Sequence, residues 1–290
     1  MKAKLTINLD EISENFDVSM EFLNKLRLNE CELRLIDGLN IALIDKQQCK
    51  NLSKRLAING VKPIAIASPI FKWHKSGDIA DMKLDSFGIN PHMTQQEKNN
   101  LVDVVIRNAV DLSVDKIRIF SGLGKSDDPI IELVNNLTFQ KLVDADDILF
   151  LLENEPVCTV HTKKHLLDFT KYITNEKYNN FGIWLDIANL IQLDEELDED
   201  FIQKIAPYIK YIHVKDFVLN DDGKINYVAA GSGIVPYESI FLMLDKYIPN
   251  NQDVIISIET HAKNEKDKYD NSQESIFFLR KLLKDIIFYL

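Results

Sequence analysis

The feature that most constrains the fold is an eightfold alternation between short apolar runs and longer amphipathic segments. The runs are rich in Ile, Val, Leu and Phe, and each is followed by a stretch with helical spacing of its apolar residues. Strands that alternate with helices are typical of βα units, and eight such units close into a parallel barrel. The sequence therefore predicts an α/β protein, a (β/α)₈ TIM barrel that forms a single domain over residues 1–290.

The predicted strands and helices follow one another without a linker rich in Pro, Gly or Ser. Strands are expected near 3–8, 30–36, 61–67, 115–121, 147–153, 180–186, 209–215 and 253–259. Helices are expected near 12–27, 45–59, 94–111, 128–143, 160–175, 199–206, 235–247 and 272–288. A doubly wound open sheet is the structural alternative, but the nucleotide-binding motifs GxGxxG and GxxxxGK[ST] do not occur in the sequence.

Composition limits the classes of partner. Hydrophobic residues make up 46% of the chain, enough for a sizeable core, and the net charge of −11 disfavours general nucleic-acid binding because phosphates repel an acidic surface. No apolar stretch of signal-peptide or membrane-span type is present, and three scattered cysteines without a CxxC pair predict no disulfide framework. We therefore expect a cytoplasmic protein with a small-molecule substrate and no nucleic-acid or membrane partner; a homo-oligomer stays open.

Ionisable residues stand at the carboxyl ends of four successive predicted strands. They are Glu153, Asp186, His213 and Glu259. Active sites of barrel enzymes lie at this end of the strands. In each strand the ionisable residue has the opposite parity to the apolar residues expected to face the helices, so its side chain should point into the barrel. We therefore expect the four side chains to converge.

This residue combination is typical of a metal site. Three carboxylates buried together repel one another and are costly to desolvate, and a divalent cation removes that cost. Three oxygen donors and one imidazole suit one Mn²⁺, Mg²⁺ or Co²⁺ ion, with Zn²⁺ as a further candidate. The alternative is that each residue merely caps a strand or pairs with Lys or Arg. The equivalent positions of all four favour the metal.

Four basic residues are candidates for substrate binding. Arg34, Arg118 and Lys215 have inward parity on their strands, and Lys72 lies in the connection after the third strand. The inward-facing charges, which also include Glu32, could orient sugar hydroxyls or a phosphate, or they could form an internal ion-pair network that fills the barrel. Lys72 is a further candidate for contact with a phosphate. Four further histidines lack metal-ligand spacing and are expected on the surface or in loops: His74, His92, His161 and His165.

The connection from Ser68 to Pro91 is unusually long and has little periodicity. Loops of this length in compact domains are usually functional or disordered. Because the connection follows a strand, a barrel would place it at the active face. We predict that the segment from Trp73 to Gly88 closes over bound substrate.

With these features in place, the sequence resembles the sugar phosphate isomerase/epimerase family, the xylose isomerase-like barrels. The resemblance covers nearly the whole chain and rests on the order and spacing of CELRLIDGLNI, IAIASPIFKW, KIRIFSG, LLENEP, WLDIANL, IHVKD, GSGIVPYESI and ISIETH. In this family the matching Glu, Asp, His and Glu bind one divalent metal ion. The resemblance therefore implies the same role for Glu153, Asp186, His213 and Glu259.

The chain departs from the ketose epimerases of the family at several places. These epimerases often carry a second Glu after the first metal Glu and a His after the metal Asp, where this chain has Cys158 and Asn189. They also tend to have an Arg after the metal His, where Lys215 and Asp216 stand. The departures count against a plain ketose epimerase, and the family also includes inosose dehydratases and hydroxypyruvate isomerases.

The resemblance and the residues together predict a divalent-metal-dependent isomerase or epimerase of a small sugar or sugar phosphate, acting in carbohydrate metabolism. Glu153 and Glu259 would be catalytic, moving a proton at the carbon next to a carbonyl while the metal holds the enediolate. The alternatives are an inosose-type dehydratase on the same scaffold and a non-catalytic sugar-binding barrel. Apurinic endonucleases share the barrel but use three-metal sites with more histidines, and this chain has six in all.

Overall fold

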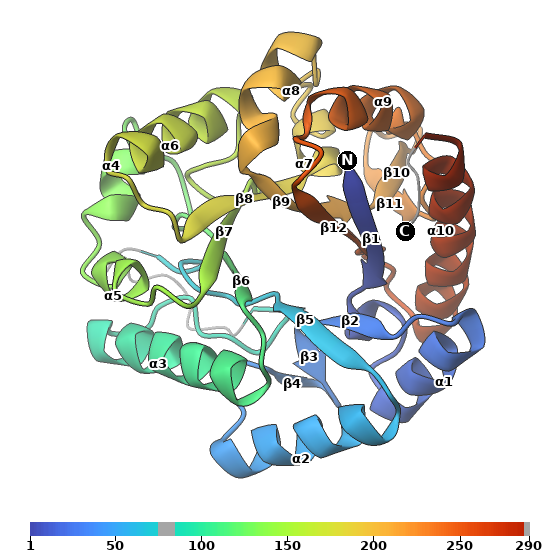
Figure 1. Cartoon of the computed structure of the whole chain (residues 1–290), viewed down its shortest axis with the longest axis horizontal. Coiled ribbons are helices and arrows are strands. Elements are labelled where there is room, and N and C mark those ends of the chain that lie inside the picture. The colour runs from blue at the N-terminus through green and yellow to red at the C-terminus, as the bar shows by residue number, and fades with distance from the viewer. Residues whose placement is uncertain (75–84, 287–290) are drawn as a thin grey trace.

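The computed structural model describes residues 1–74 and 85–286. Eight parallel strands form a barrel in the order β1-β12-β9-β8-β7-β6-β5-β2, with helices around the outside (Figure 1). The barrel strands are β1 (Lys2–Ile7), β2 (Glu30–Leu33), β5 (Lys62–Ile66), β6 (Lys116–Ile119), β7 (Leu149–Glu153), β8 (Phe181–Asp186), β9 (Ile209–Val214) and β12 (Asp253–Ile258). The predicted (β/α)₈ fold is confirmed, with all eight strands near their predicted places.

The two strands on either side of the closure differ in how they are held. β1 pairs with β12 in register along its whole length, from Lys2 opposite Asp253 to Ile7 opposite Ile258. Between β1 and β2 there is one isolated bridge, which joins Asn8 and Glu32. The Thr6 hydroxyl adds a hydrogen bond to the Glu30 carbonyl at 2.9 Å. β1 is therefore held in the sheet mainly by its pairing with β12.

The helices that cover the barrel are α1 (Phe16–Leu26), α2 (Lys46–Ile58), α3 (Gln95–Asp111), α4 (Pro129–Val134), α5 (Phe139–Val143), α6 (Lys163–Asn175), α7 (Ile187–Ile191), α8 (Glu199–Ile205), α9 (Tyr237–Tyr247) and α10 (Glu265–Ile286). Short 3₁₀ helices lie at η1 (Leu9–Glu11) and η2 (Ala206–Tyr208). α2 and α3 begin with capping boxes, in which Asp45 pairs with Gln48 and Thr94 with Glu97. Among the described residues, no helix combines the length and the apolar character needed to cross a bilayer.

Side-chain alternation along the strands divides the apolar residues into two layers. Phe150, Leu152 and Ile183 belong to the large layer between strands and helices. Leu151, Trp184, Tyr211 and Ile255 belong to a small separate cluster that fills the barrel interior. The inward and outward parities predicted from the sequence are confirmed. The same alternation points the ionisable residues at the strand ends into the barrel.

The structure also differs from the predicted elements. The helix predicted over 128–143 is broken into α4 and α5, because the Asn136 side chain accepts the Thr138 backbone N–H and offers the chain a local alternative to the helix. α10 begins at Glu265, seven residues before the predicted 272. Two hairpins were not predicted, β3 (Leu35–Ile36) with β4 (Leu39–Asn40) and β10 (Asp216–Leu219) with β11 (Ile225–Val228).

Candidate active site

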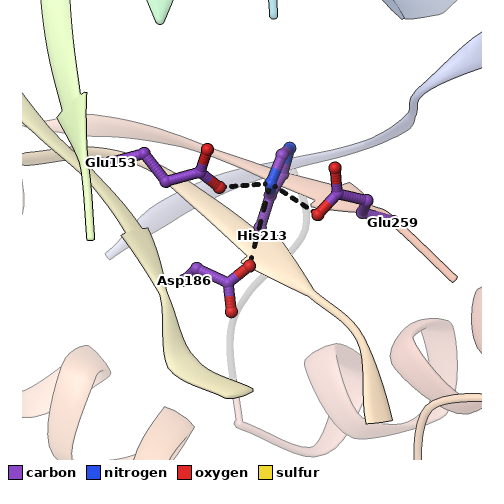
Figure 2. Close-up of side chains that lie close together, drawn as sticks. All are labelled: Glu153, Asp186, His213 and Glu259. Carbon is purple, nitrogen blue, oxygen red and sulfur yellow. Dashed lines mark hydrogen bonds and ion pairs between the residues drawn. The ribbon is translucent and has the colours of Figure 1, made fainter. Parts of the chain in front are cut away.

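The four ionisable residues predicted to converge lie together at the carboxyl ends of their strands. Glu153 ends β7, Asp186 ends β8, His213 is the penultimate residue of β9 and Glu259 follows β12. One ligand atom from each lies within 4.8 Å of all the others, and all four residues are buried. Figure 2 shows the three carboxylates around the imidazole of His213. Their convergence was predicted from strand parity and from their places at the ends of successive strands.

Asp186 is fixed by the turn into α7. Its Oδ1 accepts the backbone N–H of Asn189 at 2.9 Å and so caps this short helix. The Asn154 side chain donates to the Asp186 carbonyl at 2.8 Å and accepts its N–H at 2.9 Å. The side chain of Asn189 donates to the Asn154 carbonyl at 2.8 Å. Asn189 stands near the position where the ketose epimerases named above often carry a His. The turn leaves the other carboxylate oxygen, Oδ2, facing the cluster.

The imidazole of His213 is at the centre of the cluster. Its Nδ1 lies 2.9 Å from Glu153 Oε1, 3.3 Å from Glu259 Oε2 and 4.0 Å from Asp186 Oδ2. Burial opposes charge on this ring, but Glu259, Glu32 and Glu153 outweigh it and raise the pKa of His213 well above its ordinary value. In the metal-free protein the ring is therefore an imidazolium that partly neutralises the carboxylates.

Each carboxylate of the cluster also has a basic partner. Arg118 Nη1 lies 3.0 Å from Glu153 Oε2, and Lys215 Nζ lies 2.7 Å from Asp186 Oδ2. Arg34 Nη1 donates to Glu259 Oε1 at 2.5 Å. Three of the four predicted substrate-binding cations thus form the internal ion-pair network that was the alternative expectation. They remain next to the cluster, where a substrate would also lie.

These partners set the protonation of the carboxylates. Burial opposes ionisation of Glu153, but Arg118 and His213 overcome it and lower its pKa to about 2. Burial likewise opposes ionisation of Glu259, and His213, His261 and Lys215 hold its pKa well below the ordinary value. For Asp186, burial outweighs Lys215, and its pKa is raised. Glu153 and Glu259 are thus both ionised, as proton acceptors must be.

The donor set fits a divalent metal ion. Asp186 Oδ2 and Glu153 Oε2 are buried and have no hydrogen-bond partner among the described residues, although a cation lies near each. Carboxylate oxygens and a neutral imidazole are ligands that Mn²⁺, Mg²⁺, Co²⁺ and Zn²⁺ accept. Three carboxylates this close repel one another, and Arg34, Arg118 and Lys215 offset part of that repulsion. A metal ion would add positive charge and would coordinate the two carboxylate oxygens that accept no hydrogen bond.

Lys72, the fourth predicted substrate-binding residue, lies further out. Its Nζ is 3.5 Å from Glu155 Oε1 and 4.7 Å from the ring centre of Phe120. Arg118 lies over the same ring at 4.6 Å. Of the segment predicted to close over substrate, residues 75–84 lie outside the described residues. Within the described part, Trp73 is buried, and closure of the segment over substrate stays a prediction.

Sequence reasoning missed three residues that contact the site. Asp10 and Glu11 in η1 both pair with Arg34, and Glu11 Oε2 also accepts the backbone N–H of His261 at 2.8 Å. His261 Nε2 lies 2.9 Å from Glu259 Oε2. The inward parity that His261 shares with Glu259 was a usable signal. No strand pattern covers η1, so nothing in the sequence pointed to its two acids.

The other histidines and Asp216 have structural partners. His74 stacks on His92 with ring centres 4.6 Å apart, and His161 packs edge-on against His165 at 5.0 Å. His74, His92 and His161 lie in loops or turns, as expected, whereas His165 lies in the first turn of α6. The Asp216 carboxylate accepts backbone N–H groups from residues that include Gly231, Gly233 and Val235. Asp216 therefore anchors the loop before α9.

The sequence matches the family of the xylose isomerase-like TIM barrel over residues 28–282. The chain belongs to the xylose isomerase-like TIM barrel family. Its solved relatives share the fold at low identity. The IOLI protein with a bound zinc atom superposes with a TM-score of 0.72 at 15% identity, over 98% of this chain and 99% of that one. A search of curated protein sequences returns no match.

Enzymes of different classes are among the similar structures. A probable 3-DHS dehydratase, AsbF, from Bacillus anthracis has a TM-score of 0.67 at 17% identity, covering 96% of this chain and 99% of its own. An L-ribulose 3-epimerase has a TM-score of 0.67 at 17% identity, covering 98% and 95%. These similarities show a shared fold. The predicted family is confirmed.

Proposed function

We propose that this protein is a divalent-metal-dependent isomerase or epimerase of a small sugar or sugar phosphate. The observation that carries the proposal is the convergence of Glu153, Asp186, His213 and Glu259 within 4.8 Å at the active face of the barrel. These four residues would hold one ion, with Mn²⁺, Mg²⁺ or Co²⁺ favoured by the three carboxylates and Zn²⁺ also compatible. When bound, the ion polarises a substrate carbonyl and stabilises negative charge that develops on its oxygen.

The chain's own residues supply the proton transfer. Glu153 and Glu259 are ionised and come from β7 and β12, with β8 and β9 between them in the sheet. Two carboxylates on different sides of a substrate allow one to take a proton from the carbon beside the carbonyl and the other to return it on another face or carbon. The catalytic assignment to Glu153 and Glu259 rests on this arrangement.

The basic residues would hold the substrate's oxygens. Lys215 and Arg118 lie beside the carboxylates, where a positive group stabilises an enediolate. Arg34 orients Glu259 and closes that side of the site. Lys72, with its side chain only 21% exposed, lies at the outer edge and suits a more distant hydroxyl or phosphate.

A dehydratase is the second candidate, because a structural relative carries that activity in its name. The first proton abstraction is shared, and the two reactions diverge only when a β-hydroxyl leaves. The sugar substrate, too, is inferred from similar structures described as an L-ribulose 3-epimerase and a D-tagatose 3-epimerase-like protein. A non-catalytic sugar-binding barrel would keep the cluster and bind without turnover.

The test is proton exchange in D₂O, followed by NMR on a panel of ketoses, sugar phosphates and inososes with Mn²⁺- or Mg²⁺-loaded protein. We expect deuterium to enter a carbon next to a carbonyl in at least one compound, and the metal-free protein to be inactive. A product formed from the substrate by loss of one water molecule would establish the dehydratase. Binding without exchange across the panel would contradict an enzyme of either class.

Three broader assignments complete the proposal. We propose a cytoplasmic protein, because Cys31, Cys49 and Cys158 are all buried free thiols. The partner is a small molecule, with no nucleic acid or membrane, and a homo-oligomer stays open. Residues 1–290 would form one domain, of which 75–84 and 287–290 lie outside the described residues.

A further inference from the structure

Glu32 is a buried carboxylate that reaches His213 from across the barrel. It lies on β2 and has no exposed surface. Its two oxygens are each 3.1 Å from Nε2 of His213, the ring nitrogen that faces away from Glu153, Asp186 and Glu259. β2 and β9 are separated in the closed barrel by β1 and β12. The contact is therefore made through the interior and not between neighbouring strands.

Two hydroxyl groups hold Glu32 in this position. Tyr211 donates to its Oε2 at 2.7 Å, and Ser257 donates to the same atom at 2.6 Å. Tyr211 is itself fixed by stacking on Trp184 with ring centres 3.5 Å apart. A carboxylate with these donors can accept a further hydrogen bond but cannot supply one. The contact with Nε2 is therefore made by an N–H of the imidazole.

We propose that Glu32 is a positioning residue, which keeps the proton of His213 on Nε2 and thereby presents Nδ1 as the metal ligand. The inference rests on the proposed metal site. Nδ1 is the nitrogen that lies 2.9 Å from Glu153 Oε1 and 3.3 Å from Glu259 Oε2, so it belongs to the donor cluster. A neutral imidazole has one proton, and a carboxylate at one nitrogen fixes the tautomer and the ring orientation and raises the basicity of the other.

The first test measures the Mn²⁺ dissociation constant by calorimetry, without substrate. We expect Glu32→Gln to weaken binding about 10–100-fold. The matched control is Glu30→Gln, which removes a partly exposed carboxylate two residues earlier on the same strand. Its Mn²⁺ affinity should stay within about threefold of wild type. Glu32→Gln that binds within the same threefold would overturn the inference.

The second test reads the ring protonation of the wild-type protein directly, so its result does not depend on the stability of Glu32→Gln. Ring ¹⁵N signals of zinc-loaded protein are assigned to His213 by their loss in His213→Asn. We expect the proton on Nε2 and a metal-shifted, unprotonated Nδ1. A proton on Nδ1 would overturn the inference.

Failure of the metal site itself gives a different pattern. Mn²⁺ binding that persists undiminished in His213→Ala would overturn the proposed site, and the role of Glu32 with it. Binding lost in His213→Ala but unchanged in Glu32→Gln would overturn the role of Glu32 alone. Neither reading depends on finding the substrate.

Discussion

The two ends of the barrel interior have opposite chemistry, although the same strands build both. Leu151, Trp184 and Tyr211 form the apolar end, and the residues two positions further along the same strands are Glu153, Asp186 and His213. Two residues of a strand span about 7 Å. Two residues along each strand therefore separate the packed apolar cluster, here called the plug, from a network of buried charges. The plug contributes stability, and the charged layer costs desolvation that only its mutual pairing offsets.

The largest effect is expected in the charged layer. Glu153→Gln and Glu259→Gln should each lower turnover about 10²–10⁴-fold, because the amide keeps the shape but cannot accept the proton. The measurement is steady-state turnover with metal in excess, on whichever compound shows α-deuterium exchange. A wild-type rate in a metal-loaded variant would show that the replaced residue does not transfer the proton. It would then count against a catalytic role of the charged layer.

The apolar layer should respond in stability instead. Leu151→Ala removes a fully buried side chain and should lower the free energy of unfolding by about 2–5 kcal/mol, measured with urea. The folded variant should still bind one Mn²⁺ per chain. The control is Leu242→Ala on α9. Leu242 is 57% exposed, so its replacement should lower the free energy of unfolding by no more than about 0.5 kcal/mol. Loss of metal without loss of stability would contradict the division between the layers.

The smallest expected effect links the two layers. At a free Mn²⁺ concentration of 100 times the dissociation constant, the ion should add about 2.7 kcal/mol to the free energy of unfolding, because it binds the folded state. Wild type and Leu151→Ala should gain equally, and His213→Ala should gain nothing. Parallel urea titrations with and without Mn²⁺ measure the difference. An equal gain in His213→Ala would place the stabilising ion elsewhere.

Much of this division could be predicted from the sequence, because it follows from a period of two. The alternation around LLE and WLD placed Leu151 and Trp184 on the same face as Glu153 and Asp186. The strand order then brought the charged ends together, since parallel strands end at one face. The convergence of Glu153, Asp186, His213 and Glu259 could therefore be predicted from side-chain alternation and from the common direction of the strands.

Other parts of the site could not be predicted, because they depend on contacts between distant segments. Glu32 and Arg34 were identified as inward-facing, but their partners His213 and Glu259 are 181 and 225 residues away. Asp10 and Glu11 lie in a short 3₁₀ helix that has no periodic signal. The two hairpins carry no alternation long enough to reveal them. The sequence pattern indicates which side chains point into the barrel. It does not indicate which of them form ion pairs or hydrogen bonds with one another.

The closure of the barrel has a consequence for synthesis of the chain. β1 is made first, yet its full ladder is with β12, whose Asp253 lies opposite Lys2. At roughly 5–20 residues per second, β1 waits on the order of ten seconds to a minute for its partner to be translated. The contacts of β1 with β2 can form earlier, and they include the bridge from Asn8 to Glu32, the Thr6 hydrogen bond and the ion pair of Lys4 with Glu30. An emerging chain thus carries β1 as an incompletely paired edge strand until the last βα unit leaves the ribosome.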